Sequence, residues 1–304
     1  MGQAPIHHFD LLTGCEKFNL NQKHLNPHTM SDFSSEVLTI TYDGAIATLW
    51  LDRPERMNAF NMVFFQDLPR AIQTLSENPD TRAIVIAGKG RAFSVGLDLR
   101  EMGPLLIQEA SELSPVQHRQ HLYHTIKRLQ AAITAVATCP KPTIAAIHGY
   151  CLGAGVDLIT ACDIRLAAQN ARFSVRETRI GIVADLGTLQ RLPYLVPAGV
   201  VAELVFTGKD ISASRALAVH LVNQLYPDPE ALIQAAHEWA HEIANNSPLA
   251  VQGSKHILAK SRKLSEEEAL DYVALWNAAF LQSEDLKEAL KAFKEKREPK
   301  FTGR

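Results

Sequence analysis

Residues 148–193, HGYCLGAGVDLITACDIRLAAQNARFSVRETRIGIVADLGTLQRLP, determine the fold and the candidate site. Their pattern predicts a strand with a glycine-rich turn, a helix, a short strand pair, and a glycine-containing loop leading into another helix. Gly153, Ala154 and Gly155 open the first helix, so small side chains there leave free backbone N–H groups able to face a ligand. Small backbone donors beside acids in apolar sequence indicate a site that stabilises an oxyanion and moves protons.

Three carboxylates, Asp157, Glu177 and Asp185, interrupt this stretch where apolar sequence would otherwise continue. Each alone also has a structural interpretation. Asp157 suits the N-terminal end of a helix dipole, Glu177 could pair with a flanking arginine, and Asp185 could cap the following helix. Their shared aliphatic surroundings favour chemistry, because acids in an apolar pocket have raised pKa values and exchange protons near neutral pH.

The composition of the 304 residues limits the classes of function. Hydrophobic residues make up 46% and charged residues 21%, which is typical of a globular protein with a buried core. The net charge of −2 and the lack of a basic-aromatic stripe argue against binding to nucleic acid. Four cysteines without metal-ligand spacing, and four histidines without such spacing among residues 1–35, predict no metal site. No apolar run is long enough for a membrane span.

The rest of the chain predicts an α/β fold. Asp43-Gly44 between two alternating runs predicts a hairpin over residues 37–51. Residues 82–87 and 143–147 are compact apolar runs typical of buried strands, residues 115–138 predict a long helix, and the last third is almost entirely helical. Alternating strands and helices indicate α/β layers. We divide the chain into an N-terminal extension, a core and a helical C-terminal region (residues 1–35, 36–225 and 226–304).

Several motifs resemble the enoyl-CoA hydratase/isomerase (crotonase) superfamily, over residues 37 to the C-terminal helices. They are LDRPERMNAF, GRAFSVGLDLREM, KPTIAAIHGYCLGAGVDLITACDIR and RETRIGIVADLGTLQRLP. The resemblance implies a crotonase spiral of ββα turns with a C-terminal helical trimerisation region. It also implies a homotrimer, or a hexamer built as a dimer of trimers.

The resemblance assigns an acyl-CoA site. The thioester oxygen would be held by the backbone N–H groups of Leu97 and Ala154, and such donors are each worth about 2.7–4 kcal/mol. The substrate-binding residues it implies are Val95, Gly96, Leu97, Asp98, Leu99 and Ala154. Asp98 also has a simpler interpretation as a helix cap. CoA is part of the substrate, no cofactor is expected, and its phosphates are expected near residues 56–59 and 98–102.

Within the superfamily, the acids Asp157, Glu177 and Asp185 together resemble the Δ3,5-Δ2,4-dienoyl-CoA isomerases of fatty-acid β-oxidation. Hydratases carry Glu at the first two positions and usually Gly at the third. The resemblance implies that Glu177 removes a proton from C2, that Asp185 returns one at C6, and that Asp157 supports both. Enoyl-CoA hydratase and Δ3,Δ2-enoyl-CoA isomerase activities stay open as alternatives.

A different class of function also stays open, because some relatives in the superfamily bind RNA or act as assembly subunits. The charge balance argues against RNA here. The C-terminal residues, FTGR, do not form an SKL-type peroxisomal signal, and residues 1–35 do not have the composition of a transit or signal peptide. We therefore expect a cytoplasmic protein.

Overall fold

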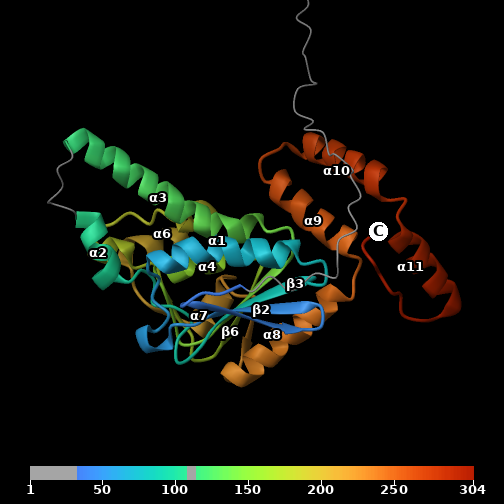
Figure 1. Ribbon diagram of the computed structural model, residues 1–304, viewed down its shortest axis with the longest axis horizontal. Coiled ribbons are helices and arrows are strands. Elements are labelled where there is room, and N and C mark those ends of the chain that lie inside the picture. The colour runs from blue at the N-terminus through green and yellow to red at the C-terminus, as the bar shows by residue number, and fades with distance from the viewer. Residues whose placement is uncertain (1–32, 108–113) are drawn as a thin grey trace, which may run out of the picture. The chain divides into compact units, whose positions relative to one another are not determined.

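The computed structural model describes residues 33–107 and 114–304, which Figure 1 shows in colour. Most of the predicted extension, including its four histidines, lies outside the described residues. The predicted boundary between residues 225 and 226 stays a prediction.

Two sheets carry the strands. The larger sheet has the order β1-β2-β3-β4-β6-β9, in which only β1 and β2 are antiparallel neighbours. Its strands are β1 (Leu38–Asp43), β2 (Ile46–Leu51), β3 (Ala83–Gly88), β4 (Thr143–Ile147), β6 (Ile164–Ala168) and β9 (Gln224–Tyr226). The smaller sheet has the order β5-β7-β8 and consists of β5 (Tyr150–Leu152), β7 (Arg172–Ser174) and β8 (Ile211–Ser212).

Helices connect these strands and make up the C-terminal part. Between the strands lie α1 (Met62–Glu77), α2 (Leu99–Ile107), α3 (Pro115–Thr138), α4 (Ala154–Ala161), α5 (Thr188–Arg191), α6 (Ala198–Thr207) and α7 (Ala213–Ala218). The C-terminal helices are α8 (Pro229–Ala244), α9 (Pro248–Ser261), α10 (Glu266–Phe280) and α11 (Glu284–Glu295). Short 3-10 turns are η1 (Pro54–Arg56), η2 (Glu177–Ile180) and η3 (Leu192–Tyr194). The predicted mixed α/β class with a helical C-terminal region is confirmed.

The predicted hairpin is present, because β1 and β2 pair from Asp43 opposite Ile46 and Gly44 between them has a φ of +55°. The glycine provides the left-handed conformation that the turn requires. The predicted helix over residues 115–138 and the strand over 143–147 also appear with those bounds. The fold is therefore largely encoded in local patterns.

The larger sheet is covered on both faces, which explains its continuous apolar strands. Ile84 and Ile86 of β3 belong to the core under α1, α3 and α4. The alternate residues Ala83, Val85 and Ala87 belong to a second core that packs against α8. Figure 1 shows α1 and α3 on one side of the sheet and α8 on the other. Alternation along a strand thus supplies both cores.

Two isolated bridges fix the loop after β3, one to the segment before α1 and one to β5, which leads into α4. Phe60 bridges Leu97, and Ser94 bridges Cys151, both in parallel. Leu152 N–H donates to Ser94 C=O at 3.0 Å, while Gly153 N–H donates to Ser174 C=O at 2.9 Å. The glycine-rich turn is therefore fixed between the loop and β7. No helix among residues 33–107 and 114–304 has the length and apolarity to cross a membrane.

Candidate active site

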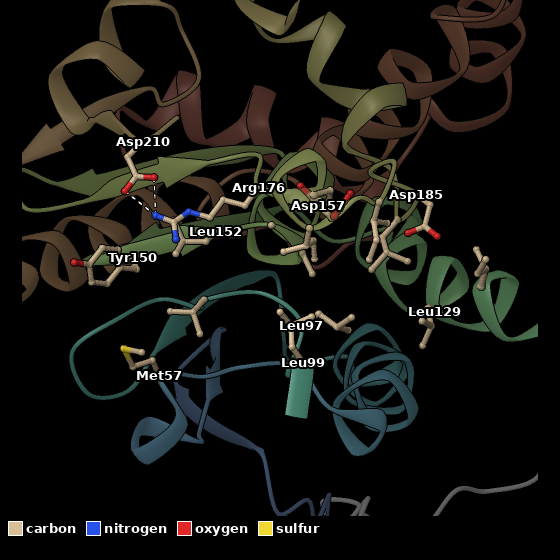
Figure 2. Close-up of a pocket in the computed structure, with 18 residues that line it drawn as sticks. Met57, Leu97, Leu99, Leu129, Tyr150, Leu152, Asp157, Arg176, Asp185 and Asp210 are labelled. Atoms are coloured by element: carbon tan, nitrogen blue, oxygen red, sulfur yellow. Dashed lines mark hydrogen bonds and ion pairs between the residues drawn. The ribbon is translucent and has the colours of Figure 1, made fainter. Parts of the chain in front are cut away.

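A cavity of about 590 Å³ lies between the loop of residues 95–99, the start of α4, η2 and α3 (Figure 2). Aliphatic side chains make up much of its wall, and five charged side chains interrupt it: Asp157, Arg176, Glu177, Asp185 and Asp210. The three acids predicted from the sequence therefore share one cavity, which also contains Leu97 and Ala154.

The backbone of Leu97 is arranged to offer its N–H to the cavity. Gly96 C=O accepts from Phe60 N–H at 2.7 Å, and Asp98 N–H donates to Phe60 C=O at 2.8 Å. Because successive peptide groups of an extended segment point to opposite sides, Leu97 N–H points away from Phe60. Within the described residues Leu97 N–H donates no hydrogen bond. It is thus available to a ligand oxygen.

Ala154 offers the second donor. It is the first residue of α4, whose first N–H groups have no partner within the helix. Gly153 precedes it with φ +51° and ψ −122°, a conformation that orients the turn. All eight residues of α4 are buried, so its N-terminal dipole acts in apolar surroundings. Ala154 N–H has no acceptor among the described residues.

Gly96 brings these two donors together. Its φ is +85°, and a methyl group on it would lie 2.6 Å from Leu152 O and 3.1 Å from Ala154 N. Only glycine permits this close approach of the two backbones. The loop and the helix start therefore form a pair of adjacent donors of the kind that stabilises an oxyanion.

Asp157 lies deepest of the three acids, with 1% of its surface exposed. Its Oδ1 accepts the N–H of Thr188, the first residue of α5, at 2.6 Å. Burial raises its pKa to about 6, with a further contribution from Asp185, although the Thr188 hydrogen bond opposes the rise. Asp157 therefore connects α4 to α5 as well as bordering the cavity.

Glu177, the first residue of η2, lies beside the glycine-rich turn. A methyl group on Gly153 would lie 3.5 Å from Glu177 Oε1. Its Oε2 is buried and has no hydrogen-bond partner within the described residues. Burial, together with repulsion from Asp157 and Asp185, raises the pKa of Glu177 to about 7. A carboxylate with this pKa can accept a proton and release it near neutral pH.

Asp185 follows Glu177 in a segment without regular secondary structure. It is half-buried, and burial raises its pKa. Figure 2 shows its side chain beyond Asp157, on the side of the cavity where Leu129 of α3 lies. The cavity thus presents one acid beside the oxyanion donors and another farther along its wall.

The remaining predicted residues divide into two groups. Val95 and Leu99 line the cavity, whereas Gly96 and Asp98 do not. Asp98 Oδ1 accepts the N–H of Arg100 at 3.1 Å, and Asp98 Oδ2 pairs with Arg53 at 2.7 Å. Asp98 therefore caps α2, as its simpler interpretation predicted, and supports the loop from outside the cavity.

An ion pair that the sequence did not indicate borders the cavity. Arg176 Nη2 contacts Asp210 Oδ1 at 2.7 Å and Oδ2 at 2.8 Å. Figure 2 shows this pair near Tyr150, away from Asp185. The two residues are 34 positions apart, and no local pattern connects them. In the part of the chain that the structure describes, no cluster of His, Cys, Asp and Glu could hold a metal ion.

Comparisons with known proteins agree with this geometry. The sequence model of the family described as Enoyl-CoA hydratase/isomerase matches residues 41–304. The peroxisomal Delta(3,5)-Delta(2,4)-dienoyl-CoA isomerase of Arabidopsis thaliana is 42% identical, over 90% of this chain and 99% of that protein. The mitochondrial enzyme of the same name from Rattus norvegicus is 41% identical, over 90% of this chain and 84% of that protein.

Among solved structures, enoyl-CoA hydratase from Bacillus anthracis matches with a TM-score of 0.80 and 30% identity. The match covers 88% of this chain and 100% of that one. The named isomerases belong to peroxisomes and mitochondria, so these comparisons give no support to the predicted cytoplasmic location.

Proposed function

Because the chain belongs to the enoyl-CoA hydratase/isomerase family, we propose that it converts 3,5-dienoyl-CoA into 2,4-dienoyl-CoA in fatty-acid oxidation. The predicted family and fold are confirmed. The observation that favours diene isomerisation over hydration is the position of the third acid. Asp185 lines the same apolar cavity as Asp157 and Glu177. This agrees with the isomerase names of the relatives that are 41–42% identical.

The first step takes place beside the oxyanion donors. The thioester oxygen accepts hydrogen bonds from Leu97 N–H and Ala154 N–H, which places C2 near Glu177 on the neighbouring turn. Glu177 takes the C2 proton, and the electron pair of the broken C–H bond forms a dienolate whose negative charge rests on the thioester oxygen. The two donors stabilise that charge as it develops.

The second step returns a proton at the far end of the conjugated system. Electrons move from the oxygen through C2, C3, C4 and C5, so that C2=C3 and C4=C5 replace the original double bonds. Asp185 donates its proton to C6, and its raised pKa favours the protonated form that this step needs. No electron is gained or lost, so the reaction requires no redox cofactor.

Asp157 has a supporting role in this scheme. Its negative charge raises the pKa of Glu177, and its hydrogen bond to Thr188 N–H connects α4 to the start of α5. The aliphatic wall keeps water away from the dienolate, which disfavours hydration.

The test is an ultraviolet assay with 3,5-dienoyl-CoA, in which the conjugated 2,4-diene thioester appears as product. The wild-type protein should form it, whereas Glu177→Gln and Asp185→Asn should each lower kcat by about 10²–10⁴-fold, the range for a lost proton-transfer group. Both variants should still bind an unreactive acyl-CoA. An inactive wild type, or full activity in Asp185→Asn, would contradict the proposal.

The same preparation distinguishes the alternatives. Hydration of crotonyl-CoA at a rate equal to the diene reaction would favour the enoyl-CoA hydratase, and migration of a single 3-ene would favour the Δ3,Δ2-isomerase. Salt-sensitive RNA binding without either activity would favour a non-enzymatic relative.

We also propose a trimer or a hexamer of two trimers. The C-terminal helices expose large apolar side chains, among them Leu258 (70%), Leu275 (70%) and Phe293 (84%). The number of large apolar side chains exposed in this helical region supports an association surface there. Sedimentation velocity should therefore give three or six times the mass of one chain, and a monomer at micromolar concentration would contradict this.

A further inference from the structure

The segment that carries Asp185 has no backbone support of its own. Residues 183–186 make no backbone–backbone hydrogen bond within the described part of the chain, although Ile182 before them and Gly187 after them do. Val183 within the segment is 71% exposed, whereas Ala184 and Leu186, on either side of Asp185, are buried in the core. The place of Asp185 between them therefore depends on side-chain packing and on side-chain hydrogen bonds.

Two side chains donate hydrogen bonds to carbonyl groups of this segment, and a third accepts one from the residue that begins α5. Gln130 of α3 donates its amide N–H to Asp185 C=O at 2.7 Å. Arg191 of α5 donates to Leu186 C=O at 3.1 Å, and Asp157 of α4 accepts from Thr188 N–H at 2.6 Å. Gln130 is the member of this set that contacts the Asp185 residue itself.

The amide of Gln130 is held in the orientation that this contact requires. Lys127, one turn earlier on α3, donates its ammonium to the Gln130 side-chain oxygen at 2.9 Å. With that oxygen occupied, the NH₂ group faces Asp185 C=O. Gln130 is half-buried, and α3 is a continuous helix of 24 residues with a capping box at its start. The donor is therefore presented from a rigid element.

We propose that Gln130 is a positioning residue that sets the place of the Asp185 carboxyl along the cavity, and so determines proton delivery at C6. This inference rests on the proposed diene isomerisation. The proposed role concerns only one of the two proton transfers. Glu177, the base for C2, is on η2, whereas Gln130 contacts the later segment that carries Asp185. Loss of the Gln130 contact should therefore impair C6 protonation and leave C2 deprotonation intact.

The central variant is Gln130→Met, which keeps the length of the side chain and removes the donor. Its matched control is Gln120→Met, an exposed position on the same helix. Gln130→Met should lower kcat about tenfold, the scale of one lost hydrogen bond at a site that needs accurate placement, with little change in KM. Gln120→Met should match the wild type.

A partition measurement separates positioning from general damage. In D₂O, a dienolate that fails to receive a proton at C6 takes deuterium at C2 and returns to labelled substrate. The ratio of C2-labelled substrate to 2,4-diene product, read by mass spectrometry, should rise about tenfold in Gln130→Met. A merely structural effect would lower both products together and leave the ratio unchanged.

Lys127→Met provides a second variant. It removes the hydrogen bond that orients the Gln130 amide and leaves Gln130 itself in place. It should shift the same ratio in the same direction by a smaller factor, about 2–5-fold. An unchanged ratio in both variants, with an active wild type, would overturn the role of Gln130 alone. A wild type without diene isomerase activity would overturn this inference together with the proposed function.

Discussion

Replacing Asp157 by Asn removes a buried negative charge that lowers the free energy of unfolding. Burial leaves 1% of Asp157 exposed and raises its pKa from 3.8, the value of an ordinary aspartate, to about 6. The asparagine oxygen can still accept the Thr188 N–H, so the link between α4 and α5 should survive. The variant therefore isolates the cost of the charge.

The sign and size of the effect follow from proton linkage. Because the folded pKa is raised, the folded protein binds more protons than the unfolded chain between about pH 3.8 and 6. The cost of the Asp157 charge thus develops as the pH rises through that interval and is complete above it. At 1.36 kcal/mol per pKa unit, Asp157→Asn should raise the free energy of unfolding by up to about 3 kcal/mol near pH 8. The gain should fall to about 1 kcal/mol near pH 4.5.

Urea unfolding of wild type and variant at both pH values measures this difference. A kinetic readout accompanies it: without the Asp157 charge the pKa of Glu177 should fall, so the pH at which exchange of the C2 hydrogen reaches half its maximal rate should move lower. A variant less stable than wild type near pH 8, or a gain that does not shrink as the pH falls, would refute this account of the buried acid.

Three further predictions test other parts of the account. In the wild type, exchange of the C2 hydrogen with solvent should become faster as the pH rises through about 7, because Glu177 must be ionised to accept the C2 proton, and a flat exchange rate between about pH 5.5 and 8.5 would argue against it as the base. Gly96→Ala should lose about 10²-fold or more in kcat, since its methyl group would meet Leu152 O at 2.6 Å, and a wild-type rate would contradict the close approach of the two backbones. Asp285→Ala should lower the free energy of unfolding by about 2–4 kcal/mol, because the buried carboxylate accepts Thr302 N–H at 2.8 Å, and an unchanged melting temperature would refute that contact.

Local sequence signals were enough for much of the fold. The Asp43-Gly44 turn and the apolar run of β4 are short-range patterns, and the structure has them where the sequence places them. The glycines beside the two proposed oxyanion donors are also local signals, but the assignment of Leu97 and Ala154 themselves came from the family resemblance. Pro69 lies inside α1, yet the helix continues from Met62 to Glu77, packed through Leu68 and Ile72 on the core.

Long-range polar contacts could not be predicted. Gln130 and Asp185 are 55 positions apart, and nothing near Gln130 distinguishes it from other polar residues of an amphipathic helix. The same holds for the Arg176–Asp210 pair on the cavity wall. Such contacts depend on how α3, η2 and β8 meet in three dimensions, which no spacing along the chain encodes.

The position of the incoming hydrogen tests the central claim most directly. When 3,5-dienoyl-CoA is converted in D₂O, the 2,4-dienoyl-CoA product should carry deuterium at C6, and Asp185→Asn should abolish that labelled product. This result would place the second proton transfer at the far carbon, where we propose that Asp185 acts. Formation of 3-hydroxyacyl-CoA in place of the conjugated diene, or C6 labelling that persists unchanged in Asp185→Asn, would contradict it.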